Sequence, residues 1–367
     1  MSWGTRRSVR RALAVLAVVS LALAGCGSDS KTNAAGKKIN DVQLLISYQQ
    51  GPVFYPFSVA RKLGYFADEG LSVNVQRTNG SSYVTQQLLA GKIDYGIANG
   101  PTDIIAFTKN PDIRVPVCYQ NRLVYHIEVL ADSPIQSVSD LKGKILGTTE
   151  VGSGEYPYAE AALHDVGLTP NTDVKFLPIG DGSAETVDAL KNHKVDAYIS
   201  EGLEFQLMSM NSGLQFRDIT PNYFQGIAGS CFVTTKQVLE DPAKAKVFIG
   251  IARAFVKGAT FGKANQQAAA AIVCADLPQT CQDQQTVAAQ LTWATTEVTP
   301  VTSGVPIGGI DIAGWQEAGK VALESGKISA PVDVNVLTGG PETVAARNQI
   351  LNFDTAQIQQ AAQTYHS

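Results

Sequence analysis

The sequence predicts an α/β protein built from two similar lobes. Short apolar segments alternate with helical segments along most of the chain, which indicates parallel βαβ units. In addition, the pattern KIDYGIANG at 92–100 returns as KVDAYISEG at 194–202. At one constant offset the matching pairs are Leu88 and Leu190, Lys92 and Lys194, Asp94 and Asp196, Ile97 and Ile199, and Gly100 and Gly202. The alternative is that any α/β protein reuses this order of helix and strand, but two lobes of like construction account for the whole set.

The first half of the chain contains strands predicted at 42–48, 72–78, 94–100 and 115–120. Pro56 begins a helix that continues to Leu63, and Gly91 ends a second helix over 82–91. A third, short helix is expected over 101–110.

The alternation then restarts. Strands are predicted at 144–150, 173–179 and 195–202, with helices over 156–167 and 183–193 between them. Long helical segments dominate the rest of the chain.

These elements predict discontinuous domains. Residues 39–130 together with 232–335 are expected to form lobe 1, and residues 131–231 to form lobe 2. Two crossing segments, near 130–134 and 229–234, would join the lobes. Residues 336–367 are expected to add a C-terminal helical tail.

The N-terminus resembles an export signal. Arg6, Arg7, Arg10 and Arg11 precede an apolar run that ends in Leu-Ala-Gly-Cys, which resembles the bacterial lipobox and makes Cys26 the expected site of lipidation. Residues 1–26 are thus expected to be a lipoprotein signal peptide, and residues 27–38 a flexible tether. Two or more acyl chains would give stable membrane anchoring. A plain secretory signal with an incidental cysteine is the alternative.

Composition narrows the class of protein. Apolar residues make up 44% of the 367, and the net charge is −4, which suits a soluble globular protein and not a disordered or nucleic-acid-binding one. Four cysteines remain after Cys26, and the preferred pairing joins Cys118 to Cys231 and Cys274 to Cys281, with free thiols as the alternative. No metal site or cofactor is expected, because the four histidines are scattered and no CxxC occurs.

Three segments, at 55–75, 88–101 and 137–156, resemble the substrate-binding proteins of ABC importers for alkanesulfonates, taurine, nitrate and thiamine-pyrimidine precursors. The likeness covers most of residues 40–335 and weakens after Gly339. It implies a two-lobed, type II periplasmic-binding-protein fold, a Venus flytrap in which each lobe is a mostly parallel sheet flanked by helices. Such a protein closes on a small ligand and presents it to a membrane permease and its ATPase.

The resemblance also implies a set of ligand-binding loops at the ends of the strands. Their residues are Tyr48, Gln49, Gln50, Phe54 and Tyr55, then Asn99, Thr102, Tyr119 and Gln120, then Ser153, Gly154, Tyr156 and Glu201, and finally Tyr223 to Gly226. The internal repeat independently makes Asn99 and Glu201 counterparts at the mouth of the crevice, where ligands of open α/β sheets bind. Ordinary loop capping is the alternative for either residue.

Charge in these loops favours one class of ligand. They carry six carboxylates, Asp103, Glu150, Glu155, Asp181, Glu201 and Glu204, against a single cation, Arg122, together with seven aromatic side chains. This composition favours a flat, amine-bearing, pyrimidine-like heterocycle over a small anion. A sulfonate, taurine or nitrate ligand is the alternative, since many of these side chains could equally lie in the core or face solvent.

An enzyme is not expected. A pyrimidine-forming enzyme of similar fold depends on pyridoxal phosphate and a cysteine cluster, and no such cluster occurs in this sequence. The motifs G-x-S-x-G, Walker A and H-E-x-x-H are also absent from the sequence. The prediction is therefore an extracytoplasmic, lipid-anchored solute-binding protein of an ABC importer, with a surface sensor module as the alternative.

Overall fold

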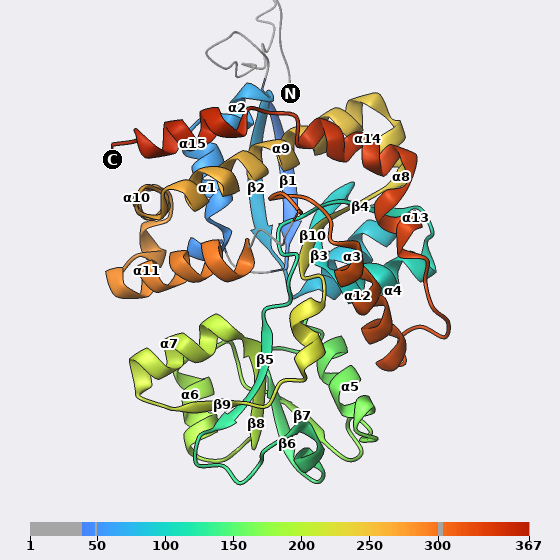
Figure 1. Ribbon diagram of the computed structural model, residues 1–367, viewed down its shortest axis with the longest axis vertical. Helices are drawn as coiled ribbons and strands as arrows, with labels where there is room; N and C mark the ends of the chain where they lie inside the picture. Colours follow the sequence, from blue (N-terminus) through green and yellow to red (C-terminus); the bar gives the residue numbers. More distant parts are fainter. Residues whose placement is uncertain (1–38, 48–49, 300–303, 367) are drawn as a thin grey trace, which may run out of the picture.

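The computed structural model describes residues 39–47, 50–299 and 304–366. Two five-stranded sheets, each flanked by helices, form two lobes stacked along the long axis of the molecule (Figure 1). The expected signal peptide, tether and lipidation site at Cys26 lie outside the described residues, as do Tyr48 and Gln49.

The sheet of lobe 1 has the strand order β2-β1-β3-β10-β4. Its strands are β1 (Asn40–Ile46), β2 (Leu71–Arg77), β3 (Tyr95–Asn99), β4 (Ile113–Cys118) and β10 (Ser230–Thr235). β1 pairs in parallel with β2 and β3, whereas β10 is antiparallel to both of its neighbours. Every residue of β3 and β4 is buried, which explains why both sequences are mostly apolar; Arg114 of β4 is the one charged residue in them.

The sheet of lobe 2 has the order β7-β6-β8-β5-β9. Its strands are β5 (Tyr125–Leu130), β6 (Ile145–Thr148), β7 (Lys175–Pro178), β8 (Ala197–Glu201) and β9 (Phe216–Asp218). β6 pairs in parallel with β7 and β8, and β5 is antiparallel to β8. The two repeat segments therefore form equivalent strands, β3 and β8, of two sheets with the same arrangement.

The structure corrects two boundaries of the expected lobes. The sequence assigns Ser230 and Cys231 to lobe 2, but they begin β10 in the sheet of lobe 1. The sequence assigns residues 125–130 to lobe 1, but they form β5, which lies between β8 and β9 in lobe 2. β5 is only partly buried, so it lacks the continuous apolar run that marked the other strands. The chain crosses between the lobes at residues 119–124 and again at 219–229.

Helices cover both sheets. Lobe 1 begins with the short turn η1 (Pro52–Phe54) and the helices α1 (Tyr55–Lys62), α2 (Tyr65–Asp68), α3 (Ser81–Leu89) and α4 (Gly100–Lys109). Lobe 2 contains α5 (Tyr156–Asp165), α6 (Ala184–Lys191) and α7 (Gly202–Ser212). The chain then adds α8 (Lys236–Glu240), α9 (Pro242–Ala264), α10 (Gln266–Asp276), α11 (Gln284–Trp293), α12 (Ile312–Glu324), α13 (Val334–Gly339), α14 (Pro341–Ile350) and α15 (Thr355–Gln363). Among the residues that the structure describes, no helix is both long and apolar enough to cross a membrane.

Helix α12 links the lobes. It packs against α4 of lobe 1 and α5 of lobe 2, with the Trp315 side chain fully buried among them. Just beyond its end, the Lys327 ammonium lies 2.8 Å from the Glu160 carboxylate of α5. The apolar core on this side therefore runs from one lobe into the other.

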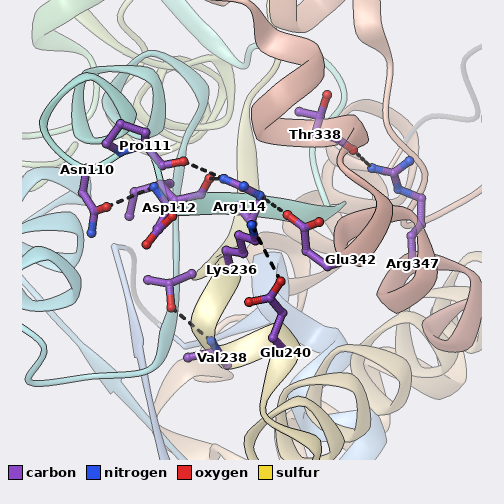
Figure 2. Close-up of polar contacts among 12 residues, drawn as sticks. Asn110, Pro111, Asp112, Arg114, Lys236, Val238, Glu240, Thr338, Glu342 and Arg347 are labelled. Atoms are coloured by element: carbon purple, nitrogen blue, oxygen red, sulfur yellow. Dashed lines mark hydrogen bonds and ion pairs between the residues drawn. The ribbon is translucent and has the colours of Figure 1, made fainter.

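The C-terminal residues complete lobe 1. Figure 2 shows the Arg114 guanidinium of β4 paired with the Glu342 carboxylate of α14, and Arg347 donating to the Thr338 carbonyl. Arg347 also donates to the Pro116 carbonyl at 2.8 Å, which ties α14 to β4 a second time. Helices α14 and α15 lie along α9 at the top of the molecule (Figure 1).

Two disulfides have the pairing expected from the sequence. Cys118 of β4 and Cys231 of β10 are register partners in the sheet and 113 residues apart; we call this bond the long-range disulfide. Cys274 and Cys281 close a loop of sequence separation 7, the short-range disulfide.

Candidate functional site

A cavity of about 240 Å3 lies between the lobes, at the carboxyl ends of the parallel strands of both sheets. This is the position at which open α/β sheets bind their ligands. Lobe 1 and the crossing segments contribute Ser47, Phe54, Arg77, Gly80, Ser81, Gln120 and Ser230. Lobe 2 contributes Tyr125, Thr149, Glu150, Ser153, Gly154, Glu155, Gly180, Asp181, Ser200, Glu201 and Glu204.

Three buried glutamates line the lobe 2 side of the cavity, and we call them the acidic wall: Glu155, Glu201 and Glu204. Glu155 accepts hydrogen bonds from the Thr149 amide at 2.8 Å and from its hydroxyl at 2.6 Å. Glu204 accepts from the Tyr198 hydroxyl at 3.0 Å and from the Ser200 hydroxyl. By contrast, Oε2 of Glu201 is buried with no hydrogen-bond partner.

Burial raises the pKa of each carboxyl group in the acidic wall. The pKa of Glu201 is raised well above its ordinary value, first by burial and then by the charges of Glu204 and Glu155. Burial raises the pKa of Glu204 to about 7, although the hydrogen bonds from Ser200 and Tyr198 oppose the shift. The pKa of Glu155 is also raised by burial. A cation or an N–H donor placed here would stabilise the ionised forms.

The lobes touch around the cavity. The Asn99 side-chain amide at the end of β3 donates to the Gly154 carbonyl of lobe 2 at 3.0 Å, and its oxygen accepts from the Thr102 amide at 3.2 Å, capping α4. Gly80 has a φ of +82°, and a Cβ there would lie 2.9 Å from the Gly152 carbonyl oxygen. Glycine at position 80 therefore allows the two backbones to approach this closely.

The sequence profile described as NMT1/THI5 like matches residues 51–269. The chain belongs to the NMT1/THI5-like family.

Similar proteins agree with this assignment. The riboflavin-binding protein RibY of Chloroflexus aurantiacus is 23% identical over 305 residues, which span 81% of this chain and 84% of RibY. A protein of solved structure from Bordetella bronchiseptica RB50 is 19% identical with a TM-score of 0.63, covering 85% of this chain and 98% of that one. The aliphatic sulphonate binding protein SsuA of Escherichia coli is 17% identical with a TM-score of 0.56, covering 81% and 91%. The solved structures show that the chain has the two-lobed fold of periplasmic binding proteins.

Five of the residues that the resemblance implied lie in the cavity wall of this NMT1/THI5-like chain: Phe54, Gln120, Ser153, Gly154 and Glu201. Asn99 does not line the cavity, but it forms the contact between the lobes beside it. Of the carboxylates counted in the sequence, Glu150, Glu155, Asp181 and Glu204 join Glu201 there.

Two of the predicted tyrosines belong to the core instead. Tyr55 is fully buried and donates to the Ala259 carbonyl at 2.9 Å, and Tyr119 is buried and donates to the Val53 carbonyl at 2.6 Å. Both side chains point into lobe 1, where they pack in its main apolar cluster.

The remaining predicted residues also lie away from the cavity wall. Gln50 donates to the Val75 carbonyl at 2.7 Å, Thr102 supports the cap of α4, and the Tyr156 ring packs edge-on against Phe176. Tyr223 packs against Phe224 within the cluster that spans the lobes, and Gly226 is exposed. Asp103 is buried inside the α4 packing, and Arg122 pairs with Glu297 at the surface.

Sequence reasoning missed much of the cavity wall. The missed residues are Ser47, Arg77, Gly80, Ser81, Tyr125, Thr149, Gly180, Ser200 and Ser230. Most are small polar or glycine residues with no chemical signature of their own. Arg77 could have been found from the sequence, because it lies at the end of a predicted strand. In the structure its guanidinium lies 3.9 Å from the Asp181 carboxylate across the cleft.

Proposed function

We propose that this chain is the solute-binding component of an ABC import system, which captures a small amine-bearing solute between its lobes and presents it to a permease. The observation that carries the proposal is the buried Oε2 of Glu201, which has no partner and belongs to a residue of the cavity wall. A buried carboxylate oxygen without a partner is costly, and an N–H group of a ligand would satisfy it.

The charge of the cavity wall supports an amine-bearing class of solute. Five carboxylates and one cation, Arg77, line the cavity, and Arg77 already pairs with Asp181. A sulfonate or nitrate would meet net negative charge in a site with little water, which disfavours binding. Two aromatic side chains, Phe54 and Tyr125, also belong to the cavity wall, and aromatic rings are common contacts for flat heterocycles. A flat, pyrimidine-like heterocycle with exposed N–H groups fits this combination best.

Capture works by a shift of population. A ligand that contacts both lobes binds the closed form more tightly than the open form, so it stabilises closure. The hydrogen bond from Asn99 to the Gly154 carbonyl exists only when the lobes meet. The permease would recognise the closed arrangement.

The proposed location is the outer face of the cell membrane, with the protein attached through a lipid on Cys26. The support is the N-terminal sequence, in which arginines precede an apolar run and Leu-Ala-Gly-Cys. The Cys26→Ser variant is expected to appear in the soluble fraction after cell lysis. Persistence of this variant in the membrane fraction would contradict lipid anchoring.

Calorimetric titration and thermal unfolding with an aminopyrimidine, riboflavin, taurine and nitrate test the ligand class. The aminopyrimidine is expected to raise the melting temperature, and Glu201→Gln to weaken its binding by about tenfold or more, since a hydrogen bond to a charged group contributes roughly 1.5–3 kcal/mol. Glu185→Gln, which changes an exposed glutamate of α6, is the matched control and should bind like the wild type. Stabilisation by taurine or nitrate alone would overturn the amine assignment. If none of the four compounds stabilised the protein, or if the bound compound were recovered chemically altered, the solute-binding proposal would fail.

A further inference from the structure

Three side chains able to bind a metal lie together on β5 and β9, the last two strands at one edge of the lobe 2 sheet. His126 and Glu128 are two residues apart on β5, so their side chains point to the same face of the sheet. Asp218 of β9 lies directly opposite Glu128 in the antiparallel register. One ligating atom from each residue lies within 4.8 Å of the other two.

Neighbouring groups hold two of these side chains in place. The Thr220 amide donates to Oδ1 of Asp218 at 2.7 Å, and the Thr220 hydroxyl donates to the same oxygen. The His126 ring lies against the start of α7, where a Cβ on Gly202 would come within 3.1 Å of Nε2. This leaves Nδ1 of His126 facing Oδ2 of Asp218 at 2.9 Å. Such outer contacts are typical of sites that orient their ligands before a metal arrives.

The site is open to solvent and has room for water. The side chains of His126 and Asp218 are 33% and 47% exposed. A cavity of about 180 Å3 lies beside them, with His126, Asp218 and Thr220 in its wall. A bound ion could therefore complete its coordination with water molecules from this cavity.

The charges favour a cation. The carboxylates of Glu128 and Asp218 face each other across an antiparallel pair and repel, and the single imidazole of His126 beside Asp218 compensates only in part. Glu297 of lobe 1 adds negative potential at His126, although it also pairs with Arg122 at 3.5 Å.

We propose that His126, Glu128 and Asp218 bind one divalent transition-metal ion, such as zinc, on the β5–β9 edge of lobe 2. One imidazole nitrogen and two carboxylate oxygens, completed by water, form a ligand set that suits zinc. On binding, Nδ1 of His126 exchanges its hydrogen bond to Asp218 for the metal. Among the described residues, no other group of three histidine, cysteine or acidic side chains brings its ligating atoms this close, so the acidic wall of the cleft is not a preformed metal site.

Zinc titration of the chelator-treated full chain tests the proposal. The wild type is expected to bind one zinc ion saturably and to melt at a higher temperature with it. His126→Gln and Asp218→Asn should each weaken binding at least tenfold. His164→Gln, which makes the same change at an exposed histidine, and Glu201→Gln in the acidic wall should bind like the wild type.

Cobalt absorption supplies a second readout, because the visible bands of Co2+ shift and strengthen when protein ligands replace water and lower its coordination number. This change should occur in the wild type and be lost in His126→Gln. Absence of saturable binding, binding unchanged in His126→Gln, or binding lost in Glu201→Gln would each overturn the site. If a variant is less stable without zinc, Glu128→Gln replaces it, since this change preserves side-chain volume and removes only the charged ligand.

Discussion

Replacing Glu342 with alanine is expected to destabilise the protein strongly. The Arg114 and Glu342 side chains are only 7% and 13% exposed, so the substitution leaves a guanidinium buried without its carboxylate (Figure 2). Losing one partner of a buried pair costs about 3–5 kcal/mol. The Pro111 and Ile113 carbonyls still accept from Arg114, at 2.7 and 2.8 Å, which places the expected loss at the lower end. A loss of about 3 kcal/mol corresponds to a fall in melting temperature of roughly 4 °C in a chain of 367 residues, since the entropy of unfolding is about 2.1 cal/mol/K per residue.

Urea unfolding and differential scanning calorimetry measure this loss. Glu240→Ala is the matched control, because Glu240 pairs with Lys236 at 3.7 Å while both side chains are exposed, so its loss should cost about 0.5 kcal/mol or less. Burial alone would raise the pKa of Glu342, but the hydrogen bond from Arg114 holds it below the ordinary value. The ion pair therefore stabilises the protein fully above the pKa that Glu342 has in the unfolded chain, and this stabilisation is lost as the pH falls through its pKa in the folded chain. The difference in free energy of unfolding between wild type and Glu342→Ala should therefore narrow in acid. Equal losses in the two alanine variants would refute the reasoning.

Three further predictions concern closure, pH and the disulfides. Asn99→Asp keeps the oxygen that caps α4 but removes the amide that donates to the Gly154 carbonyl between the lobes. Ligand binding should therefore weaken, and X-ray scattering should report a less compact chain. The melting temperature should change little. Because the pKa of Glu204 is raised to about 7, ionising this buried group destabilises the ligand-free protein. Its free energy of unfolding should fall by as much as about 3 kcal/mol as the pH rises from about 4.5 to 7. Urea unfolding of Glu204→Gln should show a smaller decline over the same pH range. By loop entropy, replacing both cysteines of the long-range disulfide with alanine should cost about 5 kcal/mol, against about 2 kcal/mol for the short-range disulfide. Similar losses from the two double variants would show that native-state contacts outweigh loop entropy.

The inner strands β3 and β8 were predictable because every residue in them is buried. β3 and β8 read as apolar runs that follow helices, and their repeat in the sequence matches their equivalent places in the two sheets. β5 and β9 were not predicted. β5 alternates partly buried and buried residues, and β9 has only three residues, so neither gives a clear apolar run.

The candidate site was predictable at the level of loops but not of side-chain direction. Glu201 ends an apolar strand and must face the crevice, whereas Tyr55 begins a helix whose buried face meets α9. A tyrosine near a strand end can point to the cleft or to the core, and only packing decides between them. The grouping of His126 with Asp218 depends on a strand pairing that no local pattern reveals.

The place of β10 within the sheet of lobe 1 has a consequence for folding. β10 lies between β3 and β4, yet the Cys231 of β10 follows the Cys118 of β4 by 113 residues. All strands of the lobe 2 sheet come between them in the chain, so that sheet can assemble from one continuous segment while the sheet of lobe 1 still lacks the strand that joins β3 to β4. Since contacts of short sequence separation form faster, lobe 2 should become protected from hydrogen exchange first during refolding, and lobe 1 should follow only when β10 inserts.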